Sequence, residues 1–155
     1  MYKSTKRYGH EIGLSCCFRQ HRADSHCKLL HGYALAFKFV FASRELDVRN
    51  WVVDFGSLKG LKAILEDTFD HTLLVAEDDP KLVTLRGLQD AGLARVIVMP
   101  AVGCEATAHL VYEVAKQWLK DAGYGDRVWL ESVEVSEHGA NSAIYIKEQR
   151  NDVQD

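Results

Sequence analysis

The sequence lacks several features that would define other classes of protein. It has only two prolines among 155 residues, and it has no run of about 18 apolar residues that would cross a membrane. The first residues contain no apolar signal core, and the formal net charge of −3 gives no general basic surface for nucleic acid. We therefore predict a cytoplasmic protein that neither spans a membrane nor binds nucleic acid.

Cysteine is present, but without the Cys-x-x-Cys spacing of a redox or metal motif. In the cytoplasm the four cysteines are expected to be thiols rather than disulfides. Each is interpreted as a small buried hydrophobic residue unless its surroundings favour reactivity. The four are Cys16, Cys17, Cys27 and Cys104.

Length and composition fit one domain over residues 1–155. The sequence is 47% apolar and 26% charged, which is ordinary for a globular protein with a real core. No internal repeat, linker or low-complexity run divides it. Residues 148–155 are expected to form a disordered tail.

Hydrophobic periodicity predicts an α+β fold. Alternating or continuous apolar residues predict strands, and apolar stripes at spacings of three and four predict helices. The predicted strands cover residues 10–20, 33–43, 51–55, 95–99, 128–137 and 142–148, with a short strand or extended loop at 72–76. The predicted helices cover 54–69, about 80–91, and 105–122. Helices between antiparallel strand pairs favour an α+β sandwich over a doubly wound sheet.

Histidines near the start of the strand at 33–43 suggest a metal site. His31 and Tyr33 lie two residues apart, so their side chains leave the same face of a strand. Zinc prefers about four ligands and accepts imidazole nitrogen, and His21 or His26 could supply another ligand. Tyr33 is an unusual ligand because a phenol, with a pKa of about 10, must lose its proton to bind well. The alternative is that these histidines simply form hydrogen bonds in a loop.

Two further groups are candidates for proton transfer. Cys27 lies between His26 and Lys28, and a nearby cation favours a reactive thiolate. Asp70 precedes His71, and a carboxylate beside an imidazole can orient it for proton transfer. The alternatives are that Cys27 is a buried loop thiol, and that Asp70 and His71 are an adjacent polar pair at the end of a helix without a catalytic role.

Two glutamates are candidates for ligand binding. Glu137 shares a strand face with Val133 and Val135, and a carboxylate on an apolar face is costly unless it is paired. It would suit the amidine-like edge of a heterocycle, although a strand-end charge reaching water is the alternative. Glu105 opens a predicted helix, where the dipole favours negative charge, so helix stabilisation is its simpler interpretation.

Together these residues form a familiar pattern. The chain resembles the 6-pyruvoyl tetrahydropterin synthase and 6-carboxytetrahydropterin synthase family, and the matching segments follow the family order over most of the sequence. The segments are C-K-L-L-H-G-Y (27–33), W-V-V-D-F-x-x-L-K (51–59), D-H-x-x-L (70–74), C-E-A-T-A (104–108) and E-H-G-A-N-S-A-I-Y (137–145).

The resemblance implies a tunnelling fold, with a four-stranded antiparallel sheet and two main helices packed on one face. It also implies trimeric barrels that stack into a homohexamer, with active sites between subunits. Family members act on 7,8-dihydroneopterin triphosphate. One branch releases triphosphate and acetaldehyde to leave 6-carboxy-5,6,7,8-tetrahydropterin, an early step toward queuosine; the other eliminates triphosphate to give 6-pyruvoyl tetrahydropterin.

The resemblance also implies roles for individual residues. Cys27 matches the proton-transferring cysteine, and Asp70 and His71 match its catalytic partners. Glu137 matches the carboxylate that holds the pterin ring, and Glu105 matches a residue near the pterin pocket.

A zinc ion is implied as the cofactor, with His21, His31 and Tyr33 as the ligand positions. The family usually has histidine where this chain has Tyr33, and His26 is an alternative replacement ligand. Zinc would polarise the side-chain hydroxyls of the substrate.

Three other departures from the family pattern stand out. Phe18-Arg19-Gln20 precedes His21 where small residues are typical, and Ala106 replaces a typical asparagine. The segment 76–98 resembles an insertion.

The leading hypothesis is therefore a lyase, most directly a 6-carboxytetrahydropterin synthase. One alternative is a non-catalytic pterin or purine binder on the same fold. Others are triphosphate elimination of the 6-pyruvoyl type, or a related substrate selected by the segment 76–98.

Overall fold

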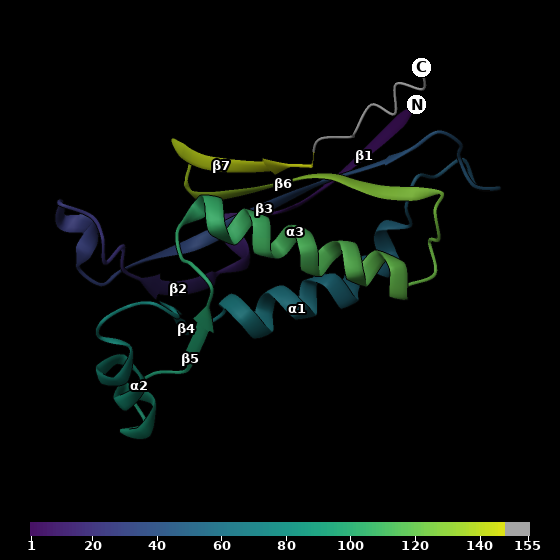
Figure 1. The fold of residues 1–155 in the computed structure, drawn as a ribbon. Helices are drawn as coiled ribbons and strands as arrows, with labels where there is room; N and C mark the ends of the chain where they lie inside the picture. Colours follow the sequence, from purple (N-terminus) through teal and green to yellow (C-terminus); the bar gives the residue numbers. More distant parts are fainter. Residues whose placement is uncertain (148–155) are drawn as a thin grey trace, which may run out of the picture.

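The computed structural model describes residues 1–147 and shows a mixed sheet with two long helices against one face (Figure 1). The strands are β1 (Tyr2–Tyr8), β2 (Leu14–Phe18), β3 (His31–Ser43), β4 (Thr72–Ala76), β5 (Val96–Met99), β6 (Val128–His138) and β7 (Asn141–Ile146). The α-helices are α1 (Lys59–Phe69), α2 (Leu82–Asp90) and α3 (Cys104–Asp121), and short 3₁₀ helices are η1 (His10–Ile12), η2 (His26–Lys28) and η3 (Phe55–Leu58). The predicted α+β class is confirmed. The predicted tail and the last residue of the predicted strand 142–148 lie outside the described residues.

The sheet has seven strands rather than the four expected, in the order β5-β4-β2-β3-β6-β7, with β1 also paired to β3. β1, β2 and β6 pair antiparallel with β3, and β7 pairs antiparallel with β6, whereas β2–β4 and β4–β5 are parallel. All five residues of β4 are buried, as is typical of a parallel strand covered on both faces. The extra strands therefore extend the expected antiparallel sheet on one side.

The predicted strand 10–20 is shorter than expected, and a strand before it was missed. η1 occupies residues 10–12, and Gly13, with a φ of 77°, turns the chain into β2. Residues 2–8 form β1, although only Tyr8 is buried there. A strand with one buried side chain shows no apolar alternation, so its residues carry little signal for a strand.

The main core lies between the sheet and the two long helices. β3 supplies Leu35, Phe37, Phe39 and Phe41, all at most 1% exposed. The predicted stripes of α1 and α3 pack against them. α1 and the residue before it contribute Leu58, Leu61, Leu65 and Phe69; α3 contributes Ala108, Val111, Ala115 and Leu119.

A smaller apolar cluster, which we call the α2 core, lies on the other side of β4. Leu73 and Val75 pack there with Leu85 of α2, while Leu74 and Ala76 face the main core. Successive side chains of β4 thus pack alternately into the α2 core and the main core. Within residues 1–147, no helix has the length and apolar character needed to cross a bilayer.

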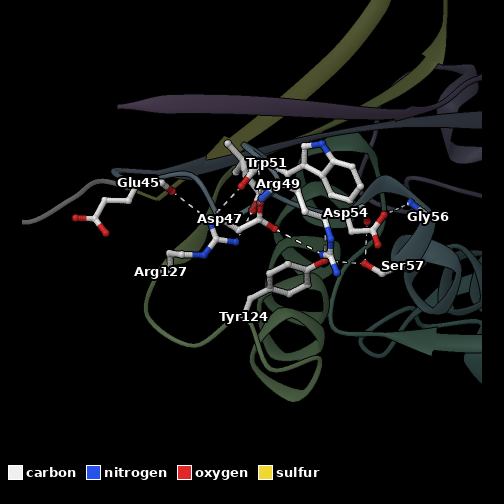
Figure 2. Close-up of polar contacts among 10 residues, drawn as sticks. Glu45, Asp47, Arg49, Trp51, Asp54, Gly56, Ser57, Tyr124 and Arg127 are labelled. Carbon is white, nitrogen blue, oxygen red and sulfur yellow. Dashed lines mark hydrogen bonds and ion pairs between the residues drawn. The ribbon is translucent and has the colours of Figure 1, made fainter.

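The predicted strand at 51–55 is a rigid loop instead (Figure 2). Arg127 donates to the carbonyl oxygens of Glu45, Trp51 and Val52, at 3.1, 3.3 and 2.8 Å. A guanidinium therefore occupies backbone acceptors that a neighbouring strand would need. The apolar pattern that predicted a strand here reflects the burial of Val52, whose backbone does not pair with another strand.

Candidate functional site

Three ionisable groups act electrostatically on Tyr33 near the start of β3. We call the four residues the tyrosine cluster: Tyr33, Cys27, Cys104 and Glu137. Burial raises the pKa of Tyr33, and Glu137, Cys27 and Cys104 add to the rise. Each of the three groups is therefore close enough to act electrostatically on the same phenol. Tyr33 comes from β3, Cys27 from η2, Cys104 from the start of α3 and Glu137 from β6.

Glu137 is placed as the sequence predicted, near apolar residues but not fully buried. Val133 and Val135 are completely buried, and Glu137 is half-buried at the next position of the same alternation. The register between β6 and β7 shifts beside it, between Ser136 and His138. Such an irregularity redirects a side chain at a strand end, so Glu137 is held away from the regular ladder.

Cys104 was missed as a site residue. Burial raises its pKa to about 12, and the carboxylates of Glu137 and Glu105 add to the rise. A cysteine at a helix N-terminus usually has a lowered pKa, but here burial and negative charge outweigh the helix dipole. The Cys104 thiol is neutral at pH 7 and can donate to Glu137. Its position at the predicted start of a helix, beside Glu105, was the signal that could have identified it.

Cys27 lies in a short, capped turn. Its backbone N–H donates to the side chain of Ser25 at 3.3 Å, and its carbonyl accepts from the N–H of Gln20 at 2.9 Å. The side chain is half-buried and the thiol is free. The turn therefore fixes the backbone of Cys27 while leaving its sulfur accessible.

Asp70 and His71 form the hydrogen-bonded pair that the sequence predicted. Nδ1 of His71 lies 2.5 Å from Oδ1 of Asp70, which leaves Nε2 facing outward from a side chain that is 87% exposed. His71 has a φ of 55° and donates its N–H to the carbonyl of Ser15. A left-handed backbone is uncommon for residues other than glycine, although histidine adopts it more often than most, and such residues concentrate at functional sites. Hydrogen bonds among residues 1–147 do not join this pair to Cys27.

A cavity of about 530 Å³ opens beside His71. Cys17 and Gly32 line it from β2 and β3, and Arg95 lines it from the chain before β5. The imidazole thus borders space that a small molecule can enter.

Glu105 is exposed in the first turn of α3. Its charge reaches Cys104, where it contributes to the raised pKa. This position fits helix stabilisation, and a contact with a ligand remains a prediction.

The two histidines expected to bind zinc differ in their contacts. Nδ1 of His31 is 2.7 Å from the carbonyl oxygen of Leu29, which leaves Nε2 of that ring available to a metal, whereas Nε2 of His21 lies 3.7 Å from Asp78. The raised pKa of Tyr33 opposes the phenolate that a metal needs. Among residues 1–147, no group of three or more His, Cys, Asp or Glu side chains is placed to hold a metal ion. A site in one chain would therefore need the Tyr33 phenol as a ligand, and the zinc ion stays a prediction.

The rigid loop of Figure 2 borders a second cavity, of about 460 Å³, to which the sequence assigned no role. Tyr2, Trp51 and Phe55 line it, each at least 44% exposed. The hydroxyl of Tyr124 accepts from the N–H of Asp54 at 3.3 Å and so helps to fix the loop. Exposed aromatic rings at a fixed loop offer apolar faces to a flat ligand.

Comparison with known sequences gives the family. The sequence profile of 6-pyruvoyl tetrahydropterin synthase matches residues 9–148. The chain therefore belongs to this family.

Two curated relatives carry a more particular name. The 6-carboxy-5,6,7,8-tetrahydropterin synthase of Aquifex aeolicus is 26% identical over 140 residues, which are 88% of this chain and 85% of that protein. The enzyme of the same name from Rickettsia bellii is 31% identical over 86 residues, 53% of this chain. That second alignment spans only 57% of the Rickettsia protein.

Solved structures share the fold. An uncharacterised protein from Wolinella succinogenes superimposes with a TM-score of 0.80 at 21% identity, over 95% of this chain and 98% of that one. The 6-pyruvoyl tetrahydropterin synthase of Plasmodium vivax gives a TM-score of 0.67 at 13% identity, over 96% of this chain and all of that one. At these identities the likeness concerns the fold alone.

Proposed function

We propose that this protein is a lyase that acts on 7,8-dihydroneopterin triphosphate, as a 6-carboxy-5,6,7,8-tetrahydropterin synthase of queuosine biosynthesis. The observation that carries the proposal is the tyrosine cluster. Glu137 is suited to hold a pterin and Cys27 is suited to move a proton, and the charges of both act on Tyr33. The names of the two curated relatives support the same activity.

Each residue has a separate task in the proposed reaction. The carboxylate of Glu137 accepts hydrogen bonds from the amino and ring N–H groups of the pterin, which fixes the ring in register. Cys27 removes a proton from the carbon beside a side-chain hydroxyl of the substrate. Asp70 orients His71, whose outward Nε2 relays a proton to or from the substrate.

The exposure of His71 supports an arrangement of several chains. A proton relay works in a site that excludes water, yet this imidazole is 87% exposed in one chain. We propose that the protein forms a homohexamer of stacked trimers, in which a second chain covers His71 and completes the site. Its proposed location is the cytoplasm.

A second candidate is a binder without catalysis. Tyr33 occupies the position of an expected histidine ligand, and no three His, Cys, Asp or Glu side chains among residues 1–147 are grouped to hold a metal ion. Under this candidate Glu137 still anchors a pterin, but no bond is broken.

Incubation of the protein with 7,8-dihydroneopterin triphosphate, followed by mass spectrometry, separates these functions. Acetaldehyde with 6-carboxytetrahydropterin supports the main proposal, whereas 6-pyruvoyl tetrahydropterin indicates the elimination reaction. Binding without any product supports the non-catalytic candidate.

A Cys27→Ala variant is the matched test of mechanism. Turnover should fall by about 10²–10⁴-fold, the usual contribution of a positioned proton-transfer group, while pterin affinity is unchanged. Val48→Ala should retain turnover, because that side chain is 99% exposed and lies outside the candidate site. Full turnover by Cys27→Ala would remove the cysteine from the mechanism.

A further inference from the structure

Two segments in which the sequence departs from the family pattern are in contact in the structure. Arg19 belongs to the unusual run before His21, and Asp79 belongs to the insertion-like segment 76–98. Nε and Nη2 of Arg19 donate to the two carboxylate oxygens of Asp79 at 2.8 and 2.7 Å. This two-point geometry is the strong form of an arginine–carboxylate pair.

Asp79 is a fixed partner rather than a flexible surface charge. Its side chain is only 1% exposed. Oδ1 also accepts from the N–H of Lys81 at 2.8 Å, and the backbone of Asp79 bonds to Ala76 and Leu82. These contacts fasten the carboxylate between β4 and α2, beside the α2 core.

Arg19 and its neighbour also hold the loop that carries Cys27. Nη1 of Arg19 donates to the carbonyl of Lys28 at 3.3 Å, so one guanidinium binds Asp79 and the far end of the loop together. Gln20 donates its N–H to the carbonyl of Cys27, and its side-chain amide donates to the carbonyl of Val102 at 3.4 Å. The loop is thereby tied to the chain just before α3, where Cys104 begins the helix.

Gly103 shows how closely the loop approaches. A Cβ at Gly103 would lie 2.2 Å from Nε2 of Gln20, and the residue has a φ of 104°. Only glycine allows this contact without displacing Gln20. The Cys27 loop therefore rests directly against the start of α3.

We propose that Arg19 and Asp79 are positioning residues that hold Cys27 in place at the tyrosine cluster. The catalytic role of the Cys27 thiol rests on the proposed function. The positioning of Cys27 by Arg19 and Asp79 does not depend on that function. The segment 76–98 then serves as a support for the Cys27 loop, and the two sequence departures form one structural unit.

A neighbouring ion pair, between Arg22 and Asp78, supplies a matched control. Arg22 binds Asp78, the neighbour of Asp79, but these side chains are 80% and 44% exposed. Exposed ion pairs contribute about 0–1 kcal/mol, whereas removing one partner of a buried pair leaves an uncompensated charge. Arg22→Ala therefore removes a nearby loop charge without releasing the loop.

The test is the rate at which iodoacetamide alkylates Cys27 in Asp79→Asn, Arg19→Lys and Arg22→Ala. Trypsin releases residues 23–28 with Cys27 as their single cysteine, so mass spectrometry follows this thiol alone. In Arg22→Ala the corresponding peptide is 20–28. The buried Cys16, distinguished from Cys17 by fragmentation of peptide 8–19, reports global unfolding in the same samples.

We expect Cys27 to react roughly tenfold faster in Asp79→Asn and Arg19→Lys, because the loop opens locally. Cys16 should stay protected, and Arg22→Ala should match the wild type. Arg19→Lys keeps the positive charge but loses the two-point hydrogen bonding of the guanidinium, so it decides the question if Asp79→Asn does not fold. Unchanged Cys27 rates, or equal acceleration of Cys27 and Cys16 in both variants, would contradict the positioning role.

Turnover provides the second readout. In Asp79→Asn and Arg19→Lys, kcat should fall roughly tenfold or more while KM changes by less than about threefold, since the pterin contact at Glu137 is untouched. A wild type without turnover would refute the proposed function and leave the alkylation result to decide the positioning role.

Discussion

The main core and the α2 core are held together in different ways. The main core packs the phenylalanines of β3 against α1 and α3, whereas the α2 core consists of three fully buried residues with partly buried neighbours. Bidentate pairing of Arg19 with Asp79 supplements the smaller core. Glu137 and Cys104 lie on elements of the main core, while the Cys27 loop is held from the α2 side. The fold and the geometry of the site therefore depend on different contacts.

The largest expected effect is on the main core. Phe39→Ala removes a completely buried ring and should lower the free energy of unfolding by about 3–5 kcal/mol. Val83→Ala in α2, where the side chain is 86% exposed, should stay within about 0.5 kcal/mol. Urea unfolding of both variants measures the difference, and a loss below 1 kcal/mol for Phe39→Ala would contradict the comparison.

The free energy of unfolding should depend on pH through a hydrogen bond between α3 and β6. Tyr112 donates its hydroxyl to the carbonyl of Leu130 at 2.9 Å, and burial, with help from Glu113 and Tyr145, raises its pKa to about 12. The unfolded chain loses this proton near pH 10, so the stabilisation is complete below pH 10 and is lost as the pH rises toward 12.

The expected slope is about 1.4 kcal/mol per pH unit between pH 10 and 12. Tyr112→Phe should lose this component and show a shallower fall in stability than the wild type over the same range. Identical slopes in the two proteins, measured by urea unfolding, would show that the phenol is not protected by the fold.

The smallest effect is expected where an exposed ion pair joins the two regions. Nη2 of Arg95, just before β5, lies 2.8 Å from Asp67 of α1, with side chains 49% and 79% exposed. Arg95→Ala should change stability by less than about 1 kcal/mol, and 1 M salt should reduce even that difference. A loss above 2 kcal/mol would mean that the regions are coupled by surface charge.

Much of the main core could be predicted from periodicity alone. The alternation of β3 and the stripes of α1 and α3 follow directly from burial on one face. β1 could not, because an edge strand of charged residues has no apolar pattern. The segment 51–55 misled the prediction because Arg127, 76 residues away from Trp51, takes its backbone acceptors.

The candidate site was predictable only in part. Glu137 and the Asp70–His71 pair had local signals: an acid on an apolar face and adjacent ionisable residues. Burial raises the pKa of Cys104 to about 12, whereas the hydrogen bonds from Arg19 lower the pKa of Asp79 to about 2. Both shifts depend on contacts with distant parts of the chain, so neither pKa could be predicted from the neighbouring residues. Likewise, spacing in the sequence did not reveal that His21 faces Asp78.

The most direct test of the proposed pterin site is the affinity of a non-reacting pterin, such as neopterin, measured by fluorescence titration. Glu137→Ala should weaken binding by about 2–5 kcal/mol, or roughly 30- to 5,000-fold in Kd. Glu134→Ala is the matched control, since that carboxylate accepts from Ser142 at 2.8 Å three positions earlier in β6. Weak binding by Glu137→Ala alone is the predicted result, and wild-type affinity in that variant would contradict a pterin site at Glu137.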